Sequence, residues 1–131
     1  MNDLKHGRHA VYSIRYHFVW IPTRRKPVLV NEVAKRLREI FQSVAADRGW
    51  TILELVIQPD HIHLFVEATT REAPYQIAHA FKGRSSRLLR QEFSHLLKLP
   101  SLWTRAYVCT TVGHVSTTTI ERYIQEQLHA D

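Results

Sequence analysis

The feature that most constrains the fold is a pair of β-rich runs on either side of a turn signal near the middle of the chain. Residues 51–58 (TILELVIQ) are apolar and β-branched, and residues 61–68 (HIHLFVEA) alternate cleanly. Pro59-Asp60 between them favours a tight turn. The pattern predicts a β-hairpin whose second strand turns Ile62, Leu64 and Val66 to one face.

The segments on both sides of the hairpin complete an alternating order of strands and helices. Asn31 is expected to be an N-cap, Gly49 to end the helix that follows, and Gly83 to interrupt a later helix at some cost in helix propensity. The predicted elements outside the hairpin are a strand at 11–21, a helix at 31–49, a helix at 74–97, a strand at 103–112 and a short helix at 118–129.

This β-α-β-β-α-β-α order predicts an α+β fold of the ferredoxin-like, RRM-like type. Such a fold has a four-stranded antiparallel sheet with two helices on one face and leaves the other face open. By analogy with that topology, the first and third strands form the central pair. The 131 residues contain no repeat or long linker and are 44% hydrophobic, which predicts one domain with a packed core.

The charge balance favours an anionic partner. Lys and Arg number 18 and Asp and Glu 12, so the formal net charge is +6. Nucleic acid is therefore the first candidate. No apolar run is long enough to span a bilayer and the first residues lack a secretory signal, so we expect no membrane partner and a cytoplasmic, nucleoid-associated protein of a prokaryote.

Two histidines on the second hairpin strand are candidate metal ligands. His61 and His63 are two residues apart and so share the face opposite the predicted core, roughly 6 to 7 Å apart at Cα. Two imidazoles at that spacing can converge on one cation. Two solvated surface histidines are the alternative. The single cysteine, Cys109, excludes a thiolate zinc site and an intramolecular disulfide.

Metal-bound imidazoles usually need a partner for their second nitrogen. Glu67, His17 and a backbone carbonyl are the candidates, and the sequence does not choose among them. Glu54 is another acidic residue near the predicted site, although an exposed strand carboxylate without a role is the alternative.

The final predicted helix carries a second pair of chemically useful side chains. Tyr123 and Gln127 are four residues apart and therefore lie on one helical face. Taken alone, a tyrosine on an amphipathic helix is more often a packing residue than a nucleophile.

Six motifs together resemble the single-tyrosine HUH transposases of the IS200/IS605 insertion-sequence group, where HUH denotes two histidines around a hydrophobic residue. The motifs occur in family order and cover nearly the whole chain. They are YHFVW at 16–20, PDHIHL at 59–64, FKGRSSR at 81–87, LW at 102–103, TVG at 111–113 and YIQEQ at 123–127.

The resemblance implies an enzyme that cuts and rejoins single-stranded DNA at insertion-sequence ends. His61, His63 and Gln127 would hold one Mg²⁺ or Mn²⁺, and Tyr123 would be the nucleophile that forms a 5′-phosphotyrosine. It also implies a substrate with subterminal hairpins, and a homodimer in which the mobile C-terminal helix, at 118–131, completes the partner's site. Gly113 would be the hinge before that helix, or else the glycine of a plain turn.

The basic residues suggest where DNA would lie. Residues 1–10 form a basic arm, residues 24–26 a basic loop, and residues 82–90 a basic stretch without any acid. Small residues such as Gly83 would let a sugar-phosphate chain come close. The candidate DNA-binding residues are Lys5, Arg8, Arg15, Arg24, Arg25, Lys26, Lys82, Arg84, Ser86, Arg87 and Arg90.

Two other functions fit parts of the pattern. A non-catalytic single-strand or RNA-binding module of RRM type explains the charge and the fold, but not the combination of the histidine pair with Tyr123 and Gln127. A nickase associated with repeated palindromes would share the catalytic centre. The short C-terminal continuation after Gln127 favours the insertion-sequence type.

Overall fold

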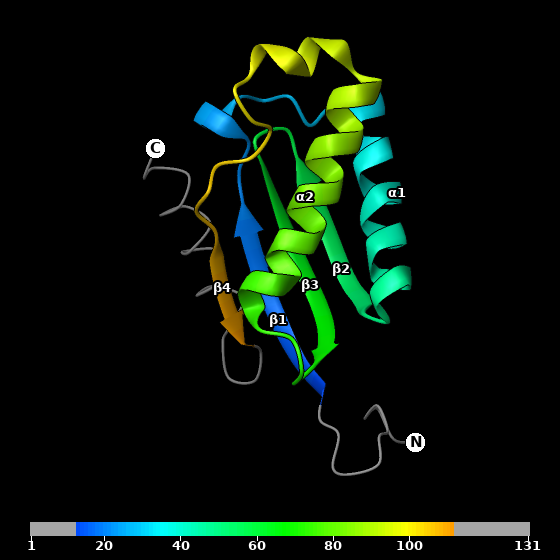
Figure 1. Ribbon diagram of the computed structural model, residues 1–131. Helices are drawn as coiled ribbons and strands as arrows, with labels where there is room; N and C mark the ends of the chain where they lie inside the picture. Colours follow the sequence, from blue (N-terminus) through cyan, green and yellow to red (C-terminus); the bar gives the residue numbers. More distant parts are fainter. Residues whose placement is uncertain (1–12, 112–131) are drawn as a thin grey trace.

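The strongly patterned segments of the sequence form the elements that the structure describes. The computed structural model describes residues 13–111 (Figure 1). The strands are β1 (Ser13–Trp20), β2 (Thr51–Gln58), β3 (His61–Thr69) and β4 (Val108–Thr111). The helices are α1 (Asn31–Arg48) and α2 (Pro74–Glu92), with short 3₁₀ helices η1 (Thr23–Arg25) and η2 (Ser94–Lys98).

The four strands form one antiparallel sheet in the order β2-β3-β1-β4. The predicted hairpin and the central position of the first and third strands are confirmed. Phe18 of β1 lies opposite Leu64 of β3, and His17 lies opposite Phe65. The strand with the two histidines, β3, therefore pairs with β1 on one side and with β2 on the other along most of its length.

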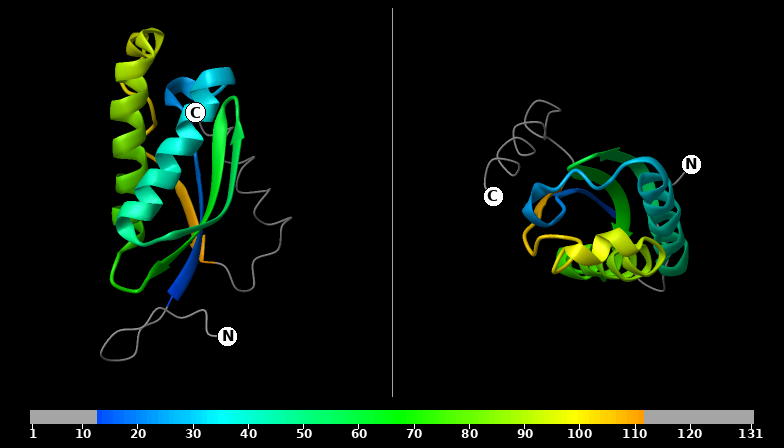
Figure 2. Two further views of the ribbon diagram at one scale, coloured as in Figure 1. Left: turned by 90° about the vertical axis from the view of Figure 1, so that its right-hand side faces the viewer. Right: turned by 90° about the horizontal axis from the view of Figure 1, so that it is seen from above.

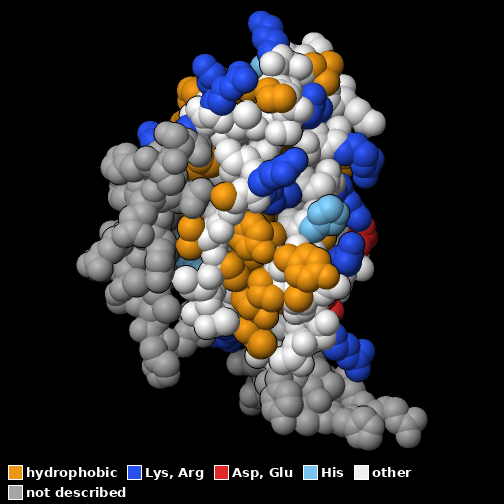
Figure 3. Space-filling model, turned by 60° about the vertical axis from the view of Figure 1, so that its left-hand side comes forward, with side chains coloured by type: hydrophobic (Ala, Val, Ile, Leu, Met, Phe, Trp, Pro, Cys, Tyr) orange, Lys and Arg blue, Asp and Glu red, His pale blue; other side chains and the backbone are white. Residues whose placement is uncertain are grey.

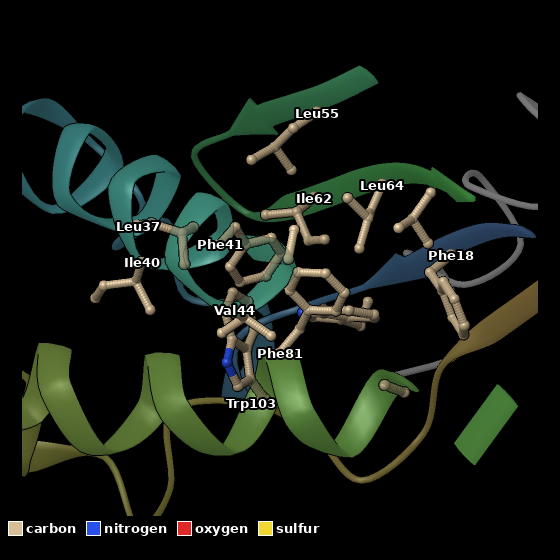
Figure 4. Close-up of a cluster of buried hydrophobic side chains, with 14 of the residues drawn as sticks. Phe18, Leu37, Ile40, Phe41, Val44, Leu55, Ile62, Leu64, Phe81 and Trp103 are labelled. Atoms are coloured by element: carbon tan, nitrogen blue, oxygen red, sulfur yellow. The ribbon is translucent and has the colours of Figure 1, made fainter. Parts of the chain in front are cut away.

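Both helices cover the same face of the sheet (Figure 2). Ile62 and Leu64 of β3 are fully buried and point toward Phe41 of α1 and Phe81 of α2 (Figure 4). The Phe41 and Phe81 rings lie 4.8 Å apart between centroids. Period-two alternation in β3 thus fills the core from one face and leaves the histidines on the other, which confirms the predicted α+β architecture. Within residues 13–111, no helix is long and apolar enough to cross a membrane.

The ends of α1 differ in how well the sequence predicted them. Gly49 ends the helix as expected, since it adopts the left-handed conformation at φ 74° and its N–H bonds to the carbonyl of Ala45. Asn31, however, is not the N-cap. Val30 holds that position without a side-chain hydrogen bond, and Asn31 is the first helical residue, with φ 53°. Asparagine tolerates this left-handed conformation better than most residues.

The predicted second helix and the last strand are both shorter than expected. α2 continues through Gly83 but ends at Glu92, because Phe93 is extended and redirects the chain into η2, where Leu96 is fully buried. The predicted strand at 103–112 is reduced to β4, which starts at Val108. Trp103 makes only a single bridge, to Pro22. The carbonyls of residues 104 and 105 bond to a side chain of α2 instead of to a strand.

A buried serine fixes Trp103 against α2. Ser85 is fully buried; its hydroxyl donates to the carbonyl of Phe81 at 2.7 Å and accepts the indole N–H of Trp103 at 2.9 Å. Ser85→Ala removes this acceptor, and a buried donor left without a partner costs about 1 to 3 kcal/mol. We expect chemical denaturation to show that loss, whereas Ser86→Ala at the half-buried neighbour stays within about 0.5 kcal/mol of the wild type. Equal stabilities of the two variants would contradict the role of Ser85.

Candidate active site

The β2–β3 turn and the start of β3 present two imidazoles on the sheet face opposite the helices. His61 and His63 are half-buried, while Ile62 and Leu64 between and beyond them are completely buried against the helices. In the neighbouring strand β2, Val56 lies opposite His63 and Gln58 opposite His61. The predicted assignment of β3 side chains to the two faces is confirmed.

His61 is oriented by the residue directly before it. Its Nδ1 lies 2.9 Å from Oδ1 of Asp60, and Oδ2 of Asp60 lies 3.4 Å from Nε of Arg25. Burial by itself raises the pKa of Asp60, but the hydrogen bond with His61 and the charges of His61 and Arg25 bring that pKa below its usual value. An ionised carboxylate only accepts hydrogen bonds, so Nδ1 of His61 is the donor. In the neutral imidazole, Nε2 then keeps its lone pair and can bind a cation.

His63 lies in a stack of rings. Its imidazole is 3.7 Å from that of His17 between centroids, with 18° between the planes, and His17 also stacks on Phe65 at 5.2 Å. Burial, with a smaller contribution from the charge of His63, lowers the pKa of His17 to about 4. Burial also lowers the pKa of His63, against an opposing effect of Glu54. Both rings are therefore neutral near pH 7, the form in which imidazole binds metals.

The imidazole nitrogens at this site supply part of the ligand set that a divalent cation needs. Nε2 of His63 and both ring nitrogens of His17 are buried and have no hydrogen-bond partner among residues 13–111. A buried nitrogen without a partner requires an explanation, and a metal ion is one. Over the same residues no group of three His, Cys, Asp or Glu side chains could hold a metal. The predicted third ligand, Gln127, and the predicted nucleophile, Tyr123, lie outside the described residues, as do the Gly113 hinge and the helix at 118–131.

The two side chains considered as partners for the imidazole nitrogens, Glu67 and His17, make other kinds of contact. Glu67 is buried and accepts a hydrogen bond from Nε of Arg15 at 3.1 Å, while His17 contacts His63 through its ring face. Asp60, which was not among the candidate residues, makes the contact with His61. The position of Asp60 in the turn, directly before His61, is the sequence feature that could have indicated this contact. Glu54 is exposed and lies opposite Phe65, from where it acts on His63 only electrostatically.

The family model for IS200-like transposases matches residues 10–127. The chain belongs to this transposase family. The predicted family resemblance is thereby confirmed.

Individual relatives agree with this assignment. The transposase is 34% identical over 128 residues to the ISDra2 transposase TnpA of Deinococcus radiodurans, with 95% of this chain and 91% of the relative covered. It is 29% identical to the IS200 transposase of Salmonella typhimurium, with 100% and 88% covered.

Solved structures agree in fold. A crystal structure of a Deinococcus radiodurans protein assigned as a transposase superimposes with a TM-score of 0.84 at 35% identity, covering 95% of this chain and 98% of that one. A REP-associated tyrosine transposase bound to a REP hairpin shares the fold, with a TM-score of 0.59 at 16% identity over 92% and 68% of the two chains.

The predicted DNA-binding residues that the structure describes belong to three parts of the transposase. Arg15 is on β1, Arg24, Arg25 and Lys26 are in or directly after η1, and Lys82, Arg84, Ser86, Arg87 and Arg90 are on α2. Several have protein partners: Arg84 Nη1 donates to Asp47 Oδ2 at 2.6 Å, and Arg90 Nη1 donates to the carbonyl of Pro100 at 3.2 Å. Lys5 and Arg8 lie outside the described residues.

The exposed side of α2 is basic and hollowed around a glycine. Basic side chains surround a hydrophobic patch on the side of the molecule where α2 and β4 lie (Figure 3). Surface hollows of about 210 and 480 Å³ both include His79 and Gly83 in their walls; Arg87 lines the first and Ser86 the second. A Cβ on Gly83 would meet nothing within 4 Å, so packing within residues 13–111 does not require a glycine there.

Lys82 is turned inward rather than outward. Its ammonium donates to the carbonyls of Thr104 at 2.6 Å and Arg105 at 3.2 Å, and lies 5.7 Å from the ring centroid of Tyr107. Burial lowers its pKa from 10.5 to about 8. In this structure Lys82 therefore ties α2 to the segment before β4, and its predicted role at a DNA phosphate stays a prediction.

The lowered pKa of Lys82 gives a stability effect with a defined sign. Between about pH 8 and 10.5 the unfolded chain keeps the proton on Lys82 and the folded chain releases it, so this residue makes the protein more stable as the pH rises through that window. We expect the stability difference between wild type and Lys82→Met to shift in favour of the wild type from pH 7 to pH 10, as measured by chemical denaturation. The matched variant Lys35→Met, at an exposed position on α1, should show no such shift; parallel behaviour of the two would contradict the prediction.

Proposed function

We propose that this transposase cuts and rejoins single-stranded DNA at the ends of an insertion sequence, with Tyr123 as the nucleophile and a divalent cation held by His61, His63 and Gln127. The observation that carries the proposal is the histidine pair on one sheet face: Asp60 occupies Nδ1 of His61, and the buried Nε2 of His63 has no partner among residues 13–111. When bound there, Mg²⁺ or Mn²⁺ would neutralise charge on a nonbridging phosphate oxygen.

The proposed step exchanges one phosphodiester bond for another. The phenol oxygen of Tyr123 attacks the scissile phosphorus, the new bond joins that oxygen to the phosphate, and the bond to the 3′ oxygen breaks. The proton lost by the phenol is balanced by the proton gained by the leaving 3′-hydroxyl. Because the 5′-phosphotyrosine keeps the phosphodiester's energy, a second 3′-hydroxyl can reverse the step on a new strand without ATP.

The proposal also includes the form of the DNA substrate and the oligomeric state of the protein. The REP-associated neighbour is bound to a REP hairpin, and we propose that this chain likewise recognises subterminal hairpins beside the cleavage sites. We further propose a homodimer in which the C-terminal helix moves about Gly113 and completes the partner subunit's site.

A covalent-adduct assay tests the function directly. Single-stranded oligonucleotides from both sides of the coding sequence, labelled at the 3′ end and incubated with protein and Mg²⁺, should yield a labelled protein adduct that survives denaturation. Binding without an adduct would contradict the enzyme and leave a passive binding module. An adduct formed only on isolated repeated palindromes would indicate a palindrome-associated nickase instead.

Arg87 offers a test of the proposed DNA-binding side of α2. Its side chain is exposed and has no partner within the described part of the chain. Arg87→Ala should weaken hairpin binding and reduce the slope of log affinity against log salt concentration by about 1, as expected for one lost phosphate contact. Fluorescence anisotropy at several salt concentrations measures both. Lys35→Ala is the matched control on α1, and an equal effect of the two changes would show that only net charge matters.

A further inference from the structure

The turn that presents His61 is held by a loop distant in sequence. The loop after β1 contacts it twice: the N–H of Leu29 donates to the carbonyl of Pro59 at 3.0 Å, and Nε of Arg25 lies 3.4 Å from Oδ2 of Asp60. The loop itself has an unusual backbone, since Arg24 and Arg25 adopt φ values of 57° and 54°. Such conformations are costly for residues other than glycine and persist only where the surroundings enforce them.

Backbone hydrogen bonds enforce this loop geometry. The N–H of Thr23 donates to the carbonyl of Leu102 at 2.8 Å, and the N–H of Arg25 donates to that of Pro22 at 2.9 Å. The guanidinium of Arg25 is therefore presented to Asp60 by a loop that is anchored to the segment before β4. Asp60 then has one carboxylate oxygen toward Arg25 and the other toward His61.

We propose that Asp60 is a positioning residue that holds His61 as the Nδ1–H tautomer, leaving Nε2 for a divalent cation, and that Arg25 holds Asp60. The inference rests on the proposed function, in which His61 is a metal ligand. A carboxylate bound to the remote nitrogen of a metal-binding imidazole fixes the ring orientation and raises its basicity. Arg25 then acts on the metal through Asp60 and His61, and its effect on the metal does not require contact with DNA.

Metal affinity of the full chain tests the proposal without reference to catalysis. Binding of Mn²⁺ alone is measured by electron paramagnetic resonance. Asp60→Ala should weaken Mn²⁺ binding by about 10- to 100-fold, the usual effect of removing such a partner. Asp60→Asn keeps an acceptor oxygen and should weaken binding less, and Arg25→Ala should act in the same direction as Asp60→Ala. The matched control is Asp47→Ala, which removes a carboxylate that is likewise paired with an arginine, Arg84, but on the helical side.

The tautomer of His61 gives an independent readout. Nitrogen-15 NMR of the metal-free protein should show a proton on Nδ1 of His61 in wild type and Asp60→Asn, and a loss of that preference in Asp60→Ala. Unchanged tautomer and unchanged Mn²⁺ affinity in Asp60→Ala would overturn the role of Asp60; unchanged affinity in Arg25→Ala alone would overturn the role of Arg25.

The variant His61→Ala separates this inference from the proposed function. If His61→Ala loses Mn²⁺ binding while Asp60→Ala retains it, His61 is a ligand and only the positioning role is wrong. If His61→Ala binds Mn²⁺ as the wild type does, the metal site itself is wrong and the inference falls with it.

Discussion

Replacing Tyr123 with phenylalanine is expected to abolish the covalent protein–DNA adduct and to leave hairpin binding nearly unchanged. The change removes one oxygen, which in the proposed mechanism is the attacking atom, and keeps the aromatic ring. Loss of a nucleophile lowers the rate by about a thousandfold or more. A denaturing gel with 3′-labelled single-stranded DNA measures the adduct, and fluorescence anisotropy of the same protein measures hairpin affinity.

Two other tyrosines provide matched controls. Tyr16 is buried in the core and Tyr107 is half-buried near Lys82, and burial raises the pKa of both phenols, which makes the attacking phenolate harder to form. Tyr16→Phe and Tyr107→Phe should therefore retain adduct formation in any variant that folds. An adduct that persists in Tyr123→Phe and disappears in one of these two would move the nucleophile to that position.

Mixed dimers test whether the site is shared between subunits. In the exchanged arrangement, a Tyr123→Phe subunit supplies intact histidines and a His61→Ala subunit supplies an intact tyrosine. One of the two sites in the mixed dimer is then complete, so adduct formation should recover when the inactive proteins are combined. No recovery in a verified heterodimer would contradict the exchange.

The sequence predicted those parts of the fold that follow from periodicity. Alternation in β3 placed Ile62 and Leu64 in the core and both histidines on the other face, because successive side chains of a strand must point to opposite sides. Gly49 was identified as a helix end because the left-handed conformation there favours glycine. Local rules were sufficient in both cases.

Element ends that depend on tertiary contacts were less predictable. The pattern of the second helix ran on to Leu97, but Phe93 turns out of the helix so that Leu96 can be buried in another direction. The first half of the strand expected from Trp103 is not a strand. There the ammonium of Lys82 donates a hydrogen bond to the carbonyl of Thr104, 22 residues later in the sequence. No local propensity in either segment encodes these partners.

In the candidate site, too, local sequence predicts some features and tertiary contacts determine the others. The pairing of His61 and His63 follows from their spacing, but the network around them joins three segments. Asp60 is a neighbour in sequence, whereas Arg25 and His17 reach the site through the β1–β3 pairing and the anchored loop. Contacts between strands depend on register, and the fold analogy predicted only that the first and third strands are neighbours, not how their residues pair.

Replacing His61 with alanine should eliminate metal-dependent cleavage while preserving hairpin binding. The change removes one of the two imidazoles proposed to hold the cation, and the remaining ligands would leave more of the ion's coordination to water. We expect cleavage to fall by about a hundredfold or more. His61 is the more informative of the two ligands to change, since the His63 ring also packs on His17 and its loss would disturb that stack.

The predicted loss of metal binding in His61→Ala can also be measured as a loss of thermal stabilisation by Mn²⁺, with a second histidine variant as the control. A ligand that binds only the folded chain stabilises it by about 2.7 kcal/mol at a concentration one hundred times its Kd. Saturating Mn²⁺ should therefore raise the melting temperature of the wild type but not that of His61→Ala. His95→Ala, which changes an exposed histidine of η2, should keep both the thermal shift and cleavage. Cleavage at the full wild-type rate in excess EDTA would contradict a metal at this site, whatever the variants show, because His61 and His63 would then act without a cation between them.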